Sequence, residues 1–197
     1  MKQEEQKYIN FRNAVLIIGL SLICFVVQMA SAAPFAMAPM ILAFVASPVA
    51  VIVSGAIFVL IMNKAPYRGT MFLFILMFSI PMLFMGTPYV VLVFLLGAIL
   101  GELIFWNNST RTPKKLAISY AIFSVALGIG TYLPAAIQKE SLLAGVKAKG
   151  IAQEVIDAYD TLYSIPFISM AIALTVAASF LGIFIGCKLF KKHFAKI

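Results

Sequence analysis

The chain has 197 residues, of which 63% are hydrophobic and 11% are charged, and its formal net charge is +8. An ordinary soluble domain has about 45–50% apolar and about 25% charged residues, and one core cannot hide this much apolar surface from water. The composition therefore excludes a soluble globular domain. It indicates a single integral membrane domain over residues 1–197.

Apolar runs along the chain have the length that a membrane-spanning helix needs, which is about 20 residues. We expect an all-α bundle of six transmembrane helices at residues 14–33, 37–62, 69–85, 89–106, 116–137 and 165–190. The triplet Ala30-Ser31-Ala32 has the form of a signal-peptidase site. The polar segment before the first run is long and contains Glu4 and Glu5, which favours a retained span over a cleaved signal peptide.

One long polar connection, residues 138–164, joins the last two runs. Within it, apolar and aromatic residues recur at helical spacing: Ile151, Val155, Tyr159 and Leu162. This pattern predicts one short amphipathic helix that lies on the membrane surface or over the bundle.

The basic residues follow the pattern that orients membrane proteins. With six spans, 12 of the 15 basic residues fall on the side of both termini, and only Lys139, Lys147 and Lys149 fall on the other. Because Lys and Arg are enriched in cytoplasmic segments, we expect both termini to be cytoplasmic and residues 138–164 to be outside. This role for the positive charge leaves no reason to expect nucleic-acid binding.

The sequence contains no P-loop, no metalloprotease or serine-hydrolase motif and no Cys/His cluster. Cys24 and Cys187 lie in apolar runs and are expected to be small buried hydrophobes. His193 lies in a basic tail that would anchor the chain at the membrane surface. We therefore expect no enzyme activity, metal or cofactor in this chain, and any ATP hydrolysis would need separate subunits.

Glu102 is the only charged residue deep within an apolar run, and such a residue is costly unless it is paired. Three basic residues are expected near the same end of the bundle: Lys64, Arg68 and Arg111. A structural ion pair or a subunit contact is favoured over proton coupling. The spacing of Gly97 and Gly101 permits close helix approach, either within the bundle or against another subunit. Ala178, Gly182 and Gly186 repeat this spacing in the last run.

Polar and aromatic side chains gather near the outer ends of the expected spans. Tyrosine is common at membrane interfaces, so each one alone is weak evidence. Together they could line an apolar pocket with a few polar groups, as small-molecule sites usually are. The candidate residues are Gln28, Met37, Met85, Tyr89, Thr131, Tyr132, Tyr159 and Tyr163. The absence of deep charge argues against a strongly ionic solute.

Four stretches are similar to the MptD/Trep_Strep family, which is grouped with the substrate-binding S components of energy-coupling factor (ECF) transporters. They are NKAPYRGTMFLFILMFSIPMLFMG, GAILGELIF, SYAIFSVALGIGTYLP and the ending LGIFIGCKLFKKHFAKI. The resemblance extends from about Met37 to the C-terminus and rests on the order of these stretches.

This resemblance implies a subunit of a bacterial cell membrane that captures a vitamin or similar micronutrient from outside. Its expected partners are a transmembrane T component, two cytoplasmic ABC ATPases, the small-molecule substrate and the lipid bilayer. It also implies that residues 31–38 and 138–164 help to close the site. The AxxxA docking pattern of several S components is not evident in 14–33. The solute stays open between a vitamin, a precursor, an aromatic metabolite and haem, which would need an outer Met or Tyr as ligand.

Two other classes of function stay open. A self-sufficient small transporter or channel predicts internal repeats or a charged pathway. A membrane-embedded enzyme or assembly factor predicts His, Asp or Cys residues clustered at one membrane face. Neither pattern is evident in the sequence.

Overall fold

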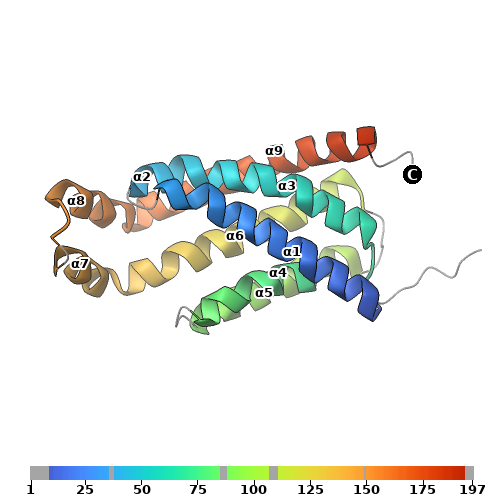
Figure 1. Ribbon diagram of the computed structural model, residues 1–197, viewed down its shortest axis with the longest axis horizontal. Helices are drawn as coiled ribbons and strands as arrows, with labels where there is room; N and C mark the ends of the chain where they lie inside the picture. Colours follow the sequence, from blue (N-terminus) through green and yellow to red (C-terminus); the bar gives the residue numbers. More distant parts are fainter. Residues whose placement is uncertain (1–8, 36–37, 85–87, 107–110, 149, 194–197) are drawn as a thin grey trace, which may run out of the picture.

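The computed structural model describes residues 9–35, 38–84, 88–106, 111–148 and 150–193, and these residues contain helices and no β-strand (Figure 1). Six long helices run along the molecule: α1 (Phe11–Ala32), α3 (Ser47–Lys64), α4 (Thr70–Phe84), α5 (Pro88–Trp106), α6 (Pro113–Ile137) and α9 (Ile165–His193). Shorter elements connect them: η1 (Ala33–Phe35), α2 (Pro39–Ile41), the π-helix η2 (Leu42–Ala46), α7 (Lys139–Ala148) and α8 (Gln153–Leu162).

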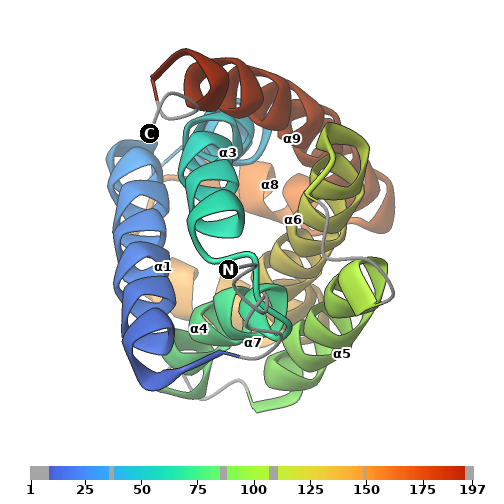
Figure 2. The ribbon, with the colours of Figure 1, turned by 90° about the vertical axis from the view of Figure 1, so that its right-hand side faces the viewer.

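Each long helix packs against two neighbours, so that the six close a ring in the order α1, α3, α9, α6, α5 and α4 (Figure 2). Aromatic side chains from α3, α4 and α6 meet inside this ring, with neighbouring ring centroids 4.7–5.5 Å apart. They are Phe58, Phe74, Phe78, Tyr120 and Phe123, and all are fully buried. Most of these pairs have the edge-to-face or tilted geometry that aromatic rings prefer. Side chains of the described residues therefore fill the interior of the ring at this level.

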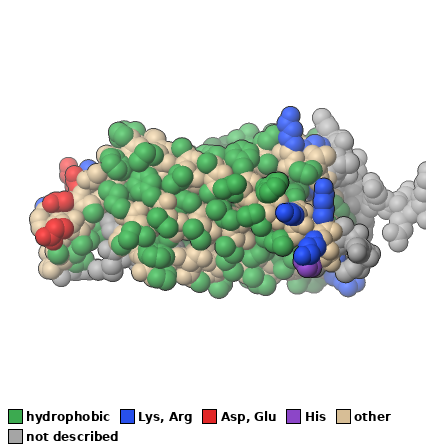
Figure 3. All heavy atoms as spheres, turned by 90° about the horizontal axis from the view of Figure 1, so that it is seen from above, with side chains coloured by type: hydrophobic (Ala, Val, Ile, Leu, Met, Phe, Trp, Pro, Cys, Tyr) green, Lys and Arg blue, Asp and Glu red, His purple; other side chains and the backbone are tan. Residues whose placement is uncertain are grey.

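The outer surface of the ring is apolar over most of its length (Figure 3). Val26 on α1, Leu92 and Leu96 on α5, and Phe184 on α9 lie on three different helices of the ring, and each is 61–67% exposed. A soluble monomer rarely exposes an apolar patch larger than a few hundred Å². Hydrocarbon is the solvent that suits this surface, so the integral membrane class expected from composition is confirmed.

Five of the helical segments are long and apolar enough to cross a membrane. They correspond to the first, second, fourth, fifth and sixth expected spans. The third, α4, is equally apolar, but it has 15 residues where a span needs about 20. Six helices thus build the ring, and the six-span prediction is supported by length for five of them.

Charge separates toward the two ends of the molecule (Figure 3). The end where α1 begins and α9 ends carries most of the described Lys and Arg residues and His193, and we call it the basic end. The opposite end is formed by α7 and α8, which carry Glu140, Glu154, Asp157 and Asp160, and we call it the acidic end. The two described ends of the chain therefore lie at the same end of the bundle.

A π-helical turn precedes α3 because of Pro48. Proline has no backbone N–H, so the regular hydrogen-bonding ladder is interrupted there. The N–H and the hydroxyl of Ser47 both donate to the Leu42 carbonyl, the latter at 2.9 Å, which satisfies the widened turn. Such single π turns are often found at functional sites.

The connection between α6 and α9 contains two helices, α7 and α8, where the sequence pattern predicts one. The predicted helix corresponds to α8, in which Ile156 and Leu162 are buried. The sequence of α7, KESLLAGVKA, has few large apolar residues, and no helix is predicted there from the sequence. Gly150 lies between the two helices with φ at +68°, a left-handed conformation that glycine adopts without strain.

Candidate functional site

A small cluster of buried residues lies at the acidic end, separate from the main core. Its buried members come from four elements: Ala43 from η2, Tyr132 from α6, Leu162 from α8 and Ala171 from α9. Met40, Phe44, Tyr163, Ile168 and Ile172 pack around them. The helix α8 contacts α2, α7 and α9. It therefore covers the end of the bundle where this tyrosine-containing cluster lies.

Tyr163 lies at the junction of α8 and α9, next to two of the other candidate residues. Its ring centroid is 5.6 Å from that of Tyr159, one helical turn earlier. Burial, with smaller contributions from the neighbouring Tyr159 and Tyr132, raises the pKa of Tyr163 to about 12. The phenol is therefore neutral at physiological pH and can donate or accept a hydrogen bond.

Tyr132 is 5% exposed, and among the described residues its hydroxyl has no hydrogen-bond partner. Ser47 lies near it, and the Ser47 hydroxyl donates its own hydrogen to the Leu42 carbonyl. A buried hydroxyl without a partner costs about 1–3 kcal/mol. A polar ligand group that reached Tyr132 would remove this cost, which makes the hydroxyl a candidate contact for a solute.

Gln28 lies in a buried hydrogen-bond network that the sequence does not indicate. Its Nε2 donates to Ser54 Oγ at 3.0 Å, and Ser54 Oγ is 2.8 Å from the hydroxyl of Tyr120. That hydroxyl is also 2.9 Å from the carbonyl of Val51. The network joins α1, α3 and α6. Ser54 and Tyr120 could be noticed in the sequence as polar residues within apolar runs. Their spacing does not show that their side chains are in contact.

Tyr89 and Thr131 lie apart from the tyrosine-containing cluster. Tyr89 packs against the main core, and its hydroxyl is buried without a partner among the described residues. Thr131 is exposed, and its hydroxyl donates to the Leu127 carbonyl of its own helix. Met37 and Met85 lie outside the described residues. The structure thus brings Tyr132, Tyr159 and Tyr163 together and places Gln28, Tyr89 and Thr131 elsewhere.

Glu102 at the basic end is held by backbone groups. It is 7% exposed, and its carboxylate accepts hydrogen bonds from the N–H groups of Gly69, Met71 and Phe72 at 2.6, 3.1 and 3.2 Å. These groups belong to the start of α4, where a helix has N–H groups without a partner of its own. Glu102 therefore caps α4 from the neighbouring helix α5, a structural role that the ion-pair expectation did not include.

The two nearby arginines hold the same corner together. Arg68 donates to the Trp106 carbonyl at 2.9 Å, and its guanidinium lies 5.3 Å from the centre of the Trp106 ring. Arg111 donates to the Tyr67 carbonyl at 2.9 Å, and its guanidinium lies over the Phe105 ring. Burial lowers the pKa of Arg111 to about 10, while the charge of Glu102 acts in the opposite direction. Arg68 thus caps the C-terminal end of α5 through the Trp106 carbonyl, and it forms no ion pair with Glu102.

The small residues of α5 pack inside the bundle. A Cβ at Gly97 would lie 3.0 Å from the Cβ of Ala126 on α6, and one at Gly101 would lie 3.0 Å from Met71 on α4. The helices α3 and α9 approach each other closely at their backbones. A Cβ at Gly55 would lie 2.8 Å from the backbone of Gly182. Of the two alternatives for Gly97 and Gly101, internal packing accounts for the observed contacts.

The apolar outer surface and the ring of long apolar helices together define a multi-pass integral membrane protein. The family model for Trep_Strep, described as a hypothetical bacterial integral membrane protein, matches residues 11–196. The chain therefore belongs to the Trep_Strep family. Neither a curated protein nor a solved structure matches it.

Proposed function

We propose that this protein is the substrate-binding S component of an ECF-type importer. It captures a small solute at the acidic end and passes it to partner subunits that hydrolyse ATP. The observation that carries this proposal is the tyrosine-containing cluster under α8, in which the Tyr132 hydroxyl is buried without a partner among the described residues. Apolar side chains with a few polar groups beneath a capping helix have the composition of a small-molecule site.

The chemistry of the cluster favours a neutral or weakly polar solute with an aromatic or other apolar part. Its described side chains are aliphatic or aromatic apart from the two tyrosine hydroxyls. The outer surface of α8 carries Glu154, Asp157 and Asp160, so an approaching anion would be repelled. Lys139, one of the few bases at this end, is engaged with Asp160 at 2.9 Å. A vitamin-like heterocycle fits this environment better than a phosphate or carboxylate compound.

The energy for import comes from other subunits in this proposal. The chain has no nucleotide-binding motif, which agrees with a T component and two ABC ATPases as partners. The alternative function is a self-sufficient small membrane transporter or channel, and the aromatic residues that fill the ring disfavour the channel. A channel would need a continuous polar or open path at this level.

The expected orientation places the basic end in the cytoplasm and the acidic end outside, since Lys and Arg are retained on the cytoplasmic side. We predict that a fluorescent protein fused to the C-terminus folds and fluoresces in bacterial cells. Alkaline phosphatase, which is active only outside the cytoplasm, should be inactive at the same position and active when inserted at Gly150 between α7 and α8. The reverse pattern would contradict the proposed direction of transport.

The ligand site predicts a defined loss of binding in two variants. Tyr132→Phe and Tyr163→Phe each remove one hydroxyl, and the loss of a hydrogen bond worth about 1 kcal/mol weakens binding about fivefold. Native mass spectrometry of the purified protein would measure the small molecule that it retains. Thr131→Ala is the matched control, because Thr131 is adjacent to Tyr132 but its hydroxyl is bonded to its own helix. Equal retention by all three variants, or no retained molecule in the parent protein, would contradict the site.

A further inference from the structure

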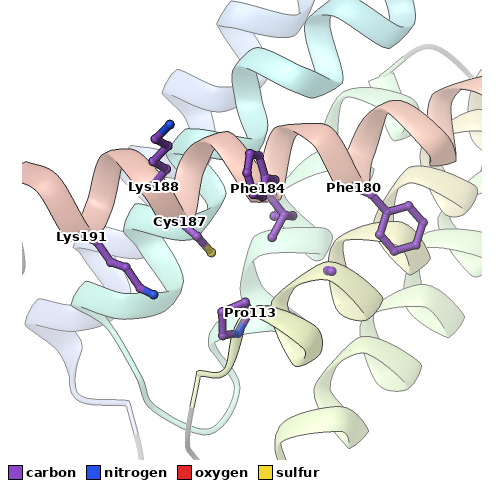
Figure 4. Close-up of a pocket in the computed structure, with 8 residues that line it drawn as sticks. Pro113, Phe180, Phe184, Cys187, Lys188 and Lys191 are labelled. Carbon is purple, nitrogen blue, oxygen red and sulfur yellow. The ribbon is translucent and has the colours of Figure 1, made fainter.

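A hollow on the outer surface at the basic end lies between the start of α6 and the last part of α9 (Figure 4). Its volume is about 490 Å³. Pro113 and Ala117 line it from α6, and Phe180, Phe184, Lys188 and Lys191 are among the residues that line it from α9. The groove and the tyrosine-containing cluster both include residues of α6 and α9, but the groove lies toward the basic end and the cluster lies at the acidic end.

The α9 side of the groove changes from apolar to basic along the helix. Phe180, Phe184, Lys188 and Lys191 follow one another at intervals of four, four and three residues, so they lie along one face of α9. At about 1.5 Å per residue, the distance from Phe180 to Lys191 is about 16 Å. This is about half of a hydrocarbon core that is about 30 Å thick, which is the depth of one leaflet. The groove therefore has the length and the polarity gradient of a single lipid acyl chain with its head group.

The side chains of Lys188 and Lys191 point in different directions. Figure 4 shows the Lys191 side chain extending from α9 toward the start of α6, where Pro113 lies, while Lys188 points away from Pro113. Lys191 is thus better placed than Lys188 to meet a group in the groove. The positive end of the α6 helix dipole faces the same region and favours an anion there.

We propose that this groove is a binding site for an anionic phospholipid. One acyl chain lies along Phe180, Phe184 and Ala117, and the phosphate lies against the ammonium group of Lys191, with a weaker contribution from Lys188. The charge of the groove supports this occupant, because both charged side chains that line it are basic, and the Cys187 thiol is the third titratable group there. Basic pockets between membrane helices on the cytoplasmic side are suited to such head groups.

The opposing explanation is that these lysines only extend to the membrane surface, as lysines at helix ends generally do. Lys192 provides the control that separates the two explanations. It is adjacent to Lys191, exposed and equally close to the membrane surface, but it does not line the groove. General attraction to an anionic surface would depend on Lys191 and Lys192 alike, whereas a built site would depend on Lys191.

The test is a titration of the detergent-solubilised protein with phosphatidylglycerol, in which native mass spectrometry measures the lipid retained. We expect saturable binding that exceeds binding of phosphatidylcholine. Lys191→Gln should weaken it about fivefold, the effect of one basic side chain near an anionic lipid. Lys188→Gln should weaken it less, and Lys192→Gln should change it by less than about twofold. Circular dichroism and gel filtration confirm that each variant is folded.

Two further experiments test whether the apolar wall of the groove contributes to binding and whether a soluble phosphate compound can replace the lipid. Phe184→Ala removes part of the wall without a change in charge, and it should also weaken phosphatidylglycerol binding. An excess of glycerol 1-phosphate should not displace the lipid. Equal losses in Lys191→Gln and Lys192→Gln, or equal binding of the two lipids, would overturn the proposal. Displacement by glycerol 1-phosphate would also overturn it, because the groove would then be a site for a soluble anion.

Discussion

Glu102→Ala is expected to lower the free energy of unfolding by about 3–5 kcal/mol, because it leaves three backbone N–H groups without their charged acceptor. These groups, on Gly69, Met71 and Phe72, lie at the start of α4 and are shielded by α5. An ordinary exposed helix cap contributes about 0.5–2 kcal/mol. The larger value applies here because the carboxylate is 7% exposed and water cannot readily replace it. Unfolding in mixed micelles with increasing denaturing detergent measures the effect.

The graded variants distinguish a capping role from proton coupling. Glu102→Gln keeps one acceptor oxygen but loses the charge, so it should cost about 1–2 kcal/mol. Leu103→Ala is the control on the same helix, since Leu103 is 56% exposed to the surroundings of the bundle and caps nothing. A role in proton coupling predicts a different result for Glu102→Gln, namely full stability with transport abolished. That result would contradict the capping assignment.

Gly182→Ala and Gly55→Ala are each expected to destabilise the protein by about 1–3 kcal/mol, the usual cost of overpacking. A Cβ added at Gly55 would lie 2.8 Å from the backbone of Gly182. A Cβ added at Gly182 would lie 3.0 Å from the backbone of Ile52. Backbone atoms cannot yield as a flexible side chain does, so α3 and α9 must separate. Gly182→Leu should prevent accumulation of folded protein altogether.

Two other glycines provide controls for this prediction. Gly19 on α1 has no atom within 4 Å of an added Cβ, so Gly19→Ala should be neutral or slightly stabilising. Gly101→Ala should lie between these extremes, because its nearest neighbour is the flexible side chain of Met71 at 3.0 Å. Thermal unfolding in one detergent would rank the four variants. Equal effects at Gly19 and Gly182 would show that the close approach of α3 and α9 does not stabilise the bundle.

The six long helices could be predicted from their apolar runs, and five of them have the length of about 20 residues that crossing a bilayer requires. The observed helices begin and end within a few residues of the expected ones, apart from the start of α3, where Pro48 and the π turn intervene. Charge placement was equally accessible, since the basic end and the acidic end follow from counting residues in connections. The helix lengths and the charge distribution depend on the lipid and water around the protein. They do not depend on which side chains are in contact inside it.

The partners of individual polar residues could not be predicted, because they depend on how each helix is rotated. Thr131 and Tyr132 are adjacent in an apolar helix, yet one is exposed and the other is buried in the tyrosine-containing cluster. Glu102 was expected to pair with a basic side chain, but its partners are backbone N–H groups, which every residue except proline has and which no sequence pattern marks. Gln28 similarly finds Ser54 across 26 residues of chain.

The measurement that most directly tests the proposed function is purification of the tagged protein from its native host in mild detergent, followed by identification of the proteins that accompany it. We expect a second multi-pass membrane subunit and ABC ATPases with nucleotide-binding motifs in a stable complex, and ATP hydrolysis by that complex. Thr131→Ala should be purified with the same partners, since it changes only an exposed hydroxyl. Recovery of the folded protein without any ATPase or T-type subunit would contradict the assignment to an ECF-type importer.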